Sequence, residues 1–167
     1  MSLRLILTRH AKSCWSDPSM EDHARPLNRR GETSAAAIGK WLTARGYVPE
    51  VALVSSSERT KQTWELVSQA FDAPPQARFL DALFHAEPDV LMDHLRRAGA
   101  GCVMLIAHNP GIAFLARGLV RQLPEDARFE RYPTAATAVI DFRAEDWGKV
   151  GWNSGEVTDL AFARDLI

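Results

Sequence analysis

The chain has 167 residues, the usual size of one domain, and its 20 Lys+Arg and 21 Asp+Glu leave a formal net charge of -1. A hydrophobic content of 46% argues against disorder, and the near-zero charge argues against a nucleic-acid binder that works through massed cationic surface. A core of this size needs neither disulfides nor a structural metal. We expect a single domain over residues 1–167.

The number of cysteines and the length of the apolar runs indicate the cellular compartment. The two cysteines, Cys14 and Cys102, are too few for a disulfide framework or for a zinc site built on paired cysteines, which predicts a reducing cytoplasm. The apolar stretch at the N-terminus is too short for a secretory core and ends in charge. Other apolar runs, such as residues 102–107, are strand-sized. The sequence therefore does not support targeting or membrane insertion.

Strand and helix patterns alternate along the chain. In chain order, we expect a strand at 3–8, a polar loop at 11–27, a helix from the N-cap Asn28 to Gly46, a strand at 51–54 and a helix capped by Ser55 and Glu58. The second half predicts a strand at 77–80, a helix from Pro88 to Gly99, a strand at 102–107, a helix from Pro110, a loop at 124–134, a strand at 136–142 and an edge strand at 149–153. This alternation predicts an α/β layer structure with a mainly parallel sheet.

Polar side chains follow three of the predicted strands. Arg9 and His10 come directly after the first strand, Arg59 lies in the first helical turn after the second, and His108 and Asn109 follow the strand at 102–107. In parallel sheets the carboxyl ends of the strands form the ligand crevice. We therefore expect these side chains to meet at one edge of the sheet.

These residue types suit a phosphoryl group. The guanidinium groups of Arg9 and Arg59 match phosphoryl oxygens, and the helix N-termini beside them add amide donors. Of the two imidazoles, His10 and His108, one can attack phosphorus while the other donates a hydrogen bond to an equatorial oxygen. The nearby arginines favour the uncharged imidazole that a nucleophile requires.

Other phosphatase chemistries lack their motifs in this sequence. Neither cysteine has an arginine six positions downstream, and there is no Asp-x-Asp pair, Gly-x-x-x-x-Gly-Lys loop, Gly-x-Ser-x-Gly elbow or His-Glu-x-x-His pair. Histidine is the remaining nucleophile. Each predicted site residue, taken alone, also fits a role without function. Arg9 and His10 could be a surface pair, His108 a core histidine and Arg59 an exposed charge on a helix.

Three ordered motifs resemble those of the histidine phosphatase superfamily. They read LTRHAKS at 7–13 with RPLNRRG at 25–31, VSSSERTKQT at 54–63 and IAHNPG at 106–111. The short chain and the Arg-His-Ala-Lys-Ser sequence are most similar to the SixA-like branch, described as protein phosphohistidine phosphatases. The resemblance implies a phosphoglycerate mutase-like three-layer αβα sandwich with a mainly parallel central sheet, and an enzyme without metal or other cofactor.

The resemblance also implies roles for individual residues. His10 is expected to be phosphorylated and the phosphoenzyme then hydrolysed, while Arg9, Arg59 and His108 hold the phosphoryl group. It also implies hydrogen bonds to the substrate from Ser16 and the backbone of Asn109. From their charge and their place in the loop, Lys12 and Arg25 are expected at the rim of the pocket as further substrate-binding residues.

The sequence departs from the family pattern at two positions. Ala11 replaces the usual glycine, a small change. His85 lies where many members place a glutamate acid, and because histidine can donate a proton near neutral pH, we assign it the general acid role. The competing acids are Asp81, Glu87 and Asp89. A phosphohistidine leaving group can already be protonated, so loss of the glutamate matters less for that substrate.

The leading hypothesis is a metal-independent phosphatase that acts through a phosphohistidine intermediate, on a phosphohistidine protein or a small phosphate ester. Few residues between Leu80 and Val90 are left to build a lid, and an open pocket favours a protein side chain. The alternatives are a small-molecule phosphomonoesterase or sugar-phosphate phosphatase, a phosphoglycerate mutase, and a non-catalytic phosphate-recognition module. We expect no nucleic-acid or membrane partner, and the oligomeric state stays open.

Overall fold

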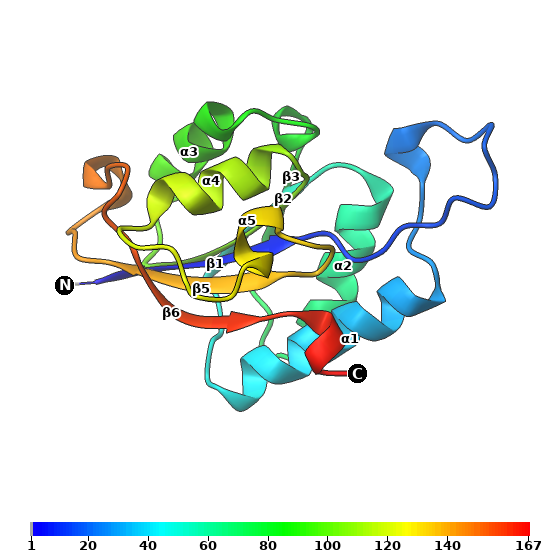
Figure 1. Cartoon of the computed structure of the whole chain (residues 1–167), viewed down its shortest axis with the longest axis horizontal. Helices are drawn as coiled ribbons and strands as arrows, with labels where there is room; N and C mark the ends of the chain where they lie inside the picture. The colour runs from blue at the N-terminus through cyan, green and yellow to red at the C-terminus, as the bar shows by residue number, and fades with distance from the viewer. Residues whose placement is uncertain (1) are drawn as a thin grey trace.

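The computed structural model describes residues 2–167 and contains one mixed sheet between two layers of helices (Figure 1). Its strands are β1 (Leu3–Arg9), β2 (Val51–Ser55), β3 (Ala77–Leu80), β4 (Cys102–Ala107), β5 (Thr137–Phe142) and β6 (Glu156–Ala161). The order across the sheet is β3-β2-β4-β1-β5-β6. The first four strands of that order pair in parallel, whereas β5 is antiparallel to β1 and β6 is antiparallel to β5. The α/β fold is confirmed, and the sheet is mixed rather than purely parallel.

The helices cover both faces of the sheet. They are α1 (Arg29–Ala44), α2 (Glu58–Ser68), α3 (Pro88–Arg96), α4 (Gly111–Leu119) and the short α5 (Arg128–Arg131). Figure 1 shows α1 and α2 on one face and α3, α4 and α5 on the other. Successive residues of β1 point to opposite faces: Leu5 and Leu7 join the cluster under α3 and α4, and Ile6 joins the cluster under α1 and α2. Burial on both faces explains why β1 has an almost continuous apolar sequence.

The N-caps of α1 and α2 test the helix starts that the sequence predicts. Asn28 caps α1 as predicted, because its Oδ1 accepts the backbone N–H of Gly31 at 2.8 Å. The predicted cap of α2 was wrong. Ser57 is the N-cap and its Oγ accepts from the N–H of Thr60, whereas Ser55 is the last residue of β2. Ser55 is therefore free to contact the residues that follow β4.

The predictions were also wrong at two places in the C-terminal third. The expected edge strand at 149–153 does not form, and the edge strand is β6. The segment before it makes a 3-10 turn at Trp147–Lys149, because the Trp147 ring is buried and its Nε1 donates to the Ala100 carbonyl at 2.6 Å. The expected loop at 124–134 contains α5.

The chain topology brings two strand ends together. Strands β1 and β4 are neighbours, and Arg9 pairs with Ala107 in their register. The helices that follow them, α1 and α4, lie on opposite faces of the sheet. Such a reversal opens a crevice at the carboxyl ends of the two strands, and His10 and His108 are the next residues of each. Within residues 2–167, no helix has the length and apolar character needed to cross a membrane.

Candidate active site

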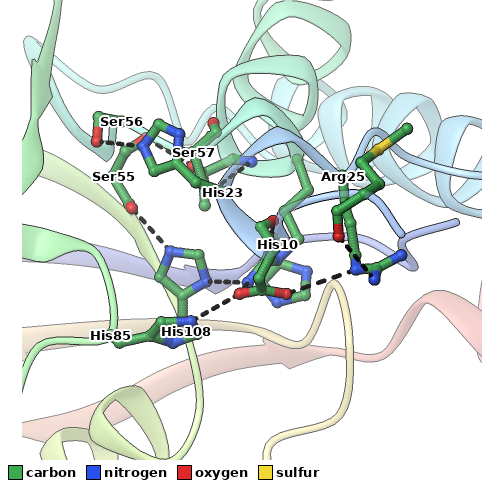
Figure 2. A network of polar contacts seen from close by, with 12 residues as sticks. His10, His23, Arg25, Ser55, Ser56, Ser57, His85 and His108 are labelled. Carbon is green, nitrogen blue, oxygen red and sulfur yellow. Dashed lines mark hydrogen bonds and ion pairs between the residues drawn. The ribbon is translucent and has the colours of Figure 1, made fainter. Parts of the chain in front are cut away.

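A pocket of about 400 Å³ lies at these strand ends and collects most of the predicted site residues. Its lining consists of Arg9, His10, Lys12, Ser13, Trp15, Asp22, Arg59, His85, His108, Asn109 and Thr134. The structure thus brings together the two predicted arginines, the three predicted histidines and the predicted contacts Lys12 and Asn109. Figure 2 shows His10, His85 and His108 gathered at this place, with Ser55 beside His108.

The His10 imidazole is only 6% exposed and is held in one orientation. Its Nδ1 lies 2.7 Å from the Ala11 carbonyl, which can only accept, so Nδ1 carries the proton and Nε2 keeps its lone pair. Burial, opposed by that hydrogen bond and assisted by Arg9 and Arg59, lowers the pKa of His10 to about 3. The imidazole is therefore neutral near pH 7, as a nucleophile requires.

The backbone after His10 is anchored to α2. The Ala11 N–H donates to Thr63 Oγ1 at 3.0 Å, and the Thr63 hydroxyl donates to the Arg59 carbonyl at 2.7 Å. This chain of hydrogen bonds links the strand end that carries His10 to the helical turn that carries Arg59.

Two arginines flank the histidines, Arg59 buried and Arg9 partly buried. Arg59 is 4% exposed, and its Nη1 and Nη2 donate to the backbone carbonyl and to carboxylate Oδ2 of Asp22 at 2.6 and 3.0 Å. Arg9 Nη1 donates to the Tyr132 carbonyl at 3.3 Å, while its buried Nε has no partner within residues 2–167. Burial, followed by the charge of Arg59, lowers the pKa of Arg9. Two cations that line the same pocket favour an anionic ligand between them.

His108 contacts groups from three elements. Its Nε2 lies 2.7 Å from Ser55 Oγ at the end of β2, and its Nδ1 accepts from Arg59 Nη2 at 3.4 Å. The ring centroids of His10 and His108 are 5.2 Å apart. Burial first, and then His10, Arg59 and His85, lower the pKa of His108 to about 2. His108 is therefore neutral, and because the Arg59 guanidinium can only donate, Nδ1 accepts and Nε2 carries the proton that faces Ser55 Oγ.

Asp22, like Ser13 and Thr134, lines the pocket although no sequence pattern indicated it. It begins the 3-10 turn Asp22–Ala24, and its Oδ2 bridges Arg59 and His85, lying 2.7 Å from His85 Nε2. Partial burial acts to raise the pKa of Asp22, but the hydrogen bonds from His85 and Arg59 outweigh it and hold the pKa below its usual value. A lone acid in a polar loop offers no spacing signal that would single it out.

The other predicted substrate contacts do not line the pocket. Arg25 is buried, and its guanidinium donates to the Asp17 and Met20 carbonyls, both at 3.0 Å, and lies 4.0 Å from the centroid of the Trp15 ring. Arg25 therefore shapes the loop that carries Asp22. The Ser16 hydroxyl is exposed and contacts Cys14 Sγ at 3.0 Å.

The position of His85 depends on close packing under the 81–87 segment. His85 has a left-handed φ of 53°, and half of its side chain is exposed. The next residue, Ala86, lies against the start of α4, where a Cβ on Gly111 would come within 2.0 Å of the Ala86 carbonyl oxygen. Only glycine allows this approach. The competing acids Asp81, Glu87 and Asp89 are not among the residues that line the pocket.

Comparison with known proteins defines the class of this site. Residues 5–81 match the family described as the histidine phosphatase superfamily (branch 1). The chain belongs to the histidine phosphatase superfamily and is a phosphatase.

Two curated relatives have no assigned activity. An uncharacterised chloroplastic protein of Arabidopsis thaliana is 39% identical over 88 residues, which are 53% of this chain and only 38% of the plant protein. An uncharacterised protein of Mycobacterium tuberculosis is 33% identical over 139 residues, covering 79% of this chain and 85% of that protein.

Among solved structures, the protein assigned as phosphohistidine phosphatase SixA in Nakamurella multipartitia is similar over nearly the whole length. The TM-score is 0.81 at 25% identity, covering 97% of this chain and 96% of that one. The fold is therefore phosphoglycerate mutase-like and SixA-like.

Proposed function

We propose that the chain is a phosphohistidine phosphatase that works without metal and through a phosphohistidine intermediate on His10. The observation that carries this proposal is the state of His10: a buried, neutral imidazole whose Nδ1 proton is engaged by Ala11, in a pocket that Arg9 and Arg59 also line. Its Nε2 lone pair is therefore available for attack.

The reaction takes place in two steps. In the first, His10 Nε2 forms a bond to phosphorus as the bond to the leaving group breaks, and the leaving group keeps that electron pair. In the second, a water oxygen forms a bond to phosphorus as the P–N bond to His10 breaks. Nε2 keeps that electron pair, the proton that water loses passes to solvent, and phosphate is released. Arg9 and Arg59 neutralise the phosphoryl oxygens through both steps.

We expect His108, which lines the pocket beside Arg59, to donate a hydrogen bond to one equatorial oxygen of the phosphoryl group. Donation from Nδ1 requires the tautomer in which Nε2 accepts a hydrogen bond from the Ser55 hydroxyl, and a hydroxyl can donate as well as accept. Ser55 can therefore pair with either tautomer of His108. In one tautomer Nδ1 accepts from Arg59, and in the other Nδ1 donates to the phosphoryl group.

His85 is the group best placed to protonate a leaving group. Half of its side chain is exposed, and the Asp22 carboxylate lies 2.7 Å from its Nε2 and orients the ring. An ester oxygen needs that proton, whereas an imidazole leaving group can carry its own. We expect His85 to matter more for esters than for phosphohistidine.

The openness of the pocket favours a protein substrate over a small ester. The segment from η2 (Asp81–Leu83) to α3 crosses the pocket edge in a few residues, and half of the His85 side chain is exposed. An open pocket admits a side chain that projects from another protein. The similarity to a protein assigned as a phosphohistidine phosphatase supports the same substrate class.

A substrate panel tests the proposal. Purified chain is assayed on a phosphohistidine protein, an alkyl phosphate, a sugar phosphate and an aryl phosphate. We expect the highest kcat/KM on the phosphohistidine protein, and in His85→Gln a larger loss on the alkyl than on the aryl phosphate. Turnover of esters alone would make the chain a small-molecule phosphatase, and tight binding without phosphate release would make it a recognition module.

A further inference from the structure

A second cleft, of about 570 Å³, adjoins the active-site pocket and shares Arg9, Lys12 and Thr134 with it. Among residues 2–167, its lining includes six cationic side chains and no acidic one; the six are Arg9, Lys12, Arg30, Arg128, Arg131 and Arg164. In a chain with a net charge of -1, this is a strong local concentration of positive charge. The proposed phosphoryl chemistry uses only Arg9 among these six.

Most of this charge is not neutralised by the protein. Arg128 is paired with Asp126 and Asp165, at 2.7 and 2.9 Å. Within the described residues, the remaining exposed cations, Lys12, Arg30, Arg131 and Arg164, form no ion pair. Several exposed arginines elsewhere, by contrast, have an acidic partner, as Arg97 has Asp93 and Arg121 has Glu156.

Four separate segments supply the unpaired cations. Lys12 follows β1, Arg30 is in the first turn of α1, Arg131 ends α5, and Arg164 is in the 3-10 turn after β6, which Figure 1 shows beside α1. The end of α5 is fixed to the active site, because Asn109 Nδ2 donates to the Arg131 carbonyl at 2.8 Å. This hydrogen bond holds the α5 side of the cleft next to the strand end that carries His108.

We propose that this cleft, from Lys12 to Arg164, docks the acidic face of a partner protein whose phosphorylated side chain enters the active-site pocket. The proposal deepens the proposed function and rests on it for the identity of that side chain. The cations are exposed and spread over four segments, an arrangement that can bind an extended acidic surface. A small anion, by contrast, is bound best where buried donors converge on one point. Long-range attraction of this kind raises the association rate and weakens with salt.

Binding of a phosphate-free probe tests the docking surface by itself. The probe is a fluorescein-labelled Glu-rich peptide, measured by anisotropy at low salt. The double variant Arg30→Glu/Arg164→Glu should weaken its binding by about tenfold or more, and added salt should weaken the parent protein's binding. The matched control is Arg143→Glu, an exposed arginine just past β5, at the opposite end of β1 from His10. The control should change binding less than about twofold, and equal losses in both variants would overturn the proposal.

Two phosphohistidine peptides of equal length, one flanked by Glu and one by Gln, extend the test to catalysis. The parent protein should prefer the Glu peptide in kcat/KM through a lower KM, and the double variant should lose that preference while hydrolysing an aryl phosphate at the parent rate. Equal kcat/KM for the two peptides overturns the docking proposal. If neither peptide is hydrolysed although the aryl phosphate is, the substrate assignment fails, and the anisotropy result still decides the docking surface.

Discussion

Asp22 occupies a donor of Arg59 that the proposed reaction needs. Its carboxylate Oδ2 lies 3.0 Å from Arg59 Nη2, where a phosphoryl oxygen would accept the same hydrogen bond. A bound phosphate dianion and the Asp22 carboxylate therefore compete for one guanidinium and repel each other. The same carboxylate supports His85, so Asp22 combines an unfavourable effect on anion binding with a favourable one on proton donation.

Replacing Asp22 with Asn separates these effects. Asp22→Asn removes the competing charge, so the inhibition constant of inorganic phosphate should fall by about three- to tenfold, equivalent to about 1 kcal/mol. Turnover of an alkyl phosphate should fall at the same time, because His85 loses its anionic partner. Inhibition and turnover assays check both. Asp17→Asn, in the same loop, should change neither value, and weaker phosphate binding in Asp22→Asn would contradict the competition.

At the scale of elements, the start of α4 determines where the segment with His85 lies. Gly111 begins α4 and contacts the Ala86 carbonyl so closely that no Cβ fits between them. His85, one residue earlier, has a left-handed backbone conformation that persists only when its surroundings hold it. The contact therefore couples helix packing to the position of the proposed acid.

Gly111→Ala should lower the free energy of unfolding by about 1–3 kcal/mol, because the added methyl group overpacks a backbone contact. The displaced 81–87 segment should also reduce alkyl phosphatase activity. Chemical denaturation and the ester assay measure the two effects. Gly151→Ala provides the control, since a Cβ there has nothing within 4 Å; equal stability of the two variants would show that the Gly111 contact carries no constraint.

The elements that the sequence predicts well are those with local signals. β1 is a mainly apolar run and β4 a continuous one, and Asn28 has the capping geometry that its sequence context indicates. β6 was missed because its sequence, EVTDLA, is largely polar and only partly buried, so its place depends on pairing with β5. The cap of α2 was misassigned because a run of three serines leaves the choice of N-cap to the tertiary contact between Ser55 and His108.

At the scale of the whole molecule, the sheet topology explains which site residues were predictable. Arg9, His10 and His108 meet because parallel strand ends share one edge, a rule that needs only the strand assignments. This rule does not predict Asp22, which lies in a loop and not at a strand end. The position of Asp22 depends on Arg25, which donates to three backbone carbonyls of the same loop. The cytoplasmic location and the absence of nucleic-acid partners stay predictions.

Burial of two neutral histidines makes the stability of the molecule depend on pH. The pKa is about 3 for His10 and about 2 for His108 in the folded chain, both below the ordinary value of 6.5. Between these values and 6.5 the unfolded chain binds more protons than the folded one. The free energy of unfolding therefore falls as the pH drops below about 6.5, by about 2 kcal/mol per histidine at pH 5.

A non-titrating variant isolates this effect. His10→Asn keeps a donor for the Ala11 carbonyl, and the loss of unfolding free energy between pH 7 and pH 5 should be about 2 kcal/mol smaller than in the parent chain. Denaturant titrations at the two pH values measure it. His94→Asn, at a partly exposed position on α3, should keep the parent slope. If His10→Asn lost as much unfolding free energy between pH 7 and pH 5 as the parent chain does, His10 would not be buried in its neutral form.

The most direct test of the account is to find the phosphoryl group on His10. Chain mixed with an aryl phosphate is quenched in alkali within the first turnover, digested and examined by mass spectrometry. We predict one phosphoryl group on the peptide that contains His10, no label and no turnover in His10→Ala, and both retained in His94→Ala. Phosphate release by His10→Ala at the parent rate, or a label on a different residue, would contradict the account.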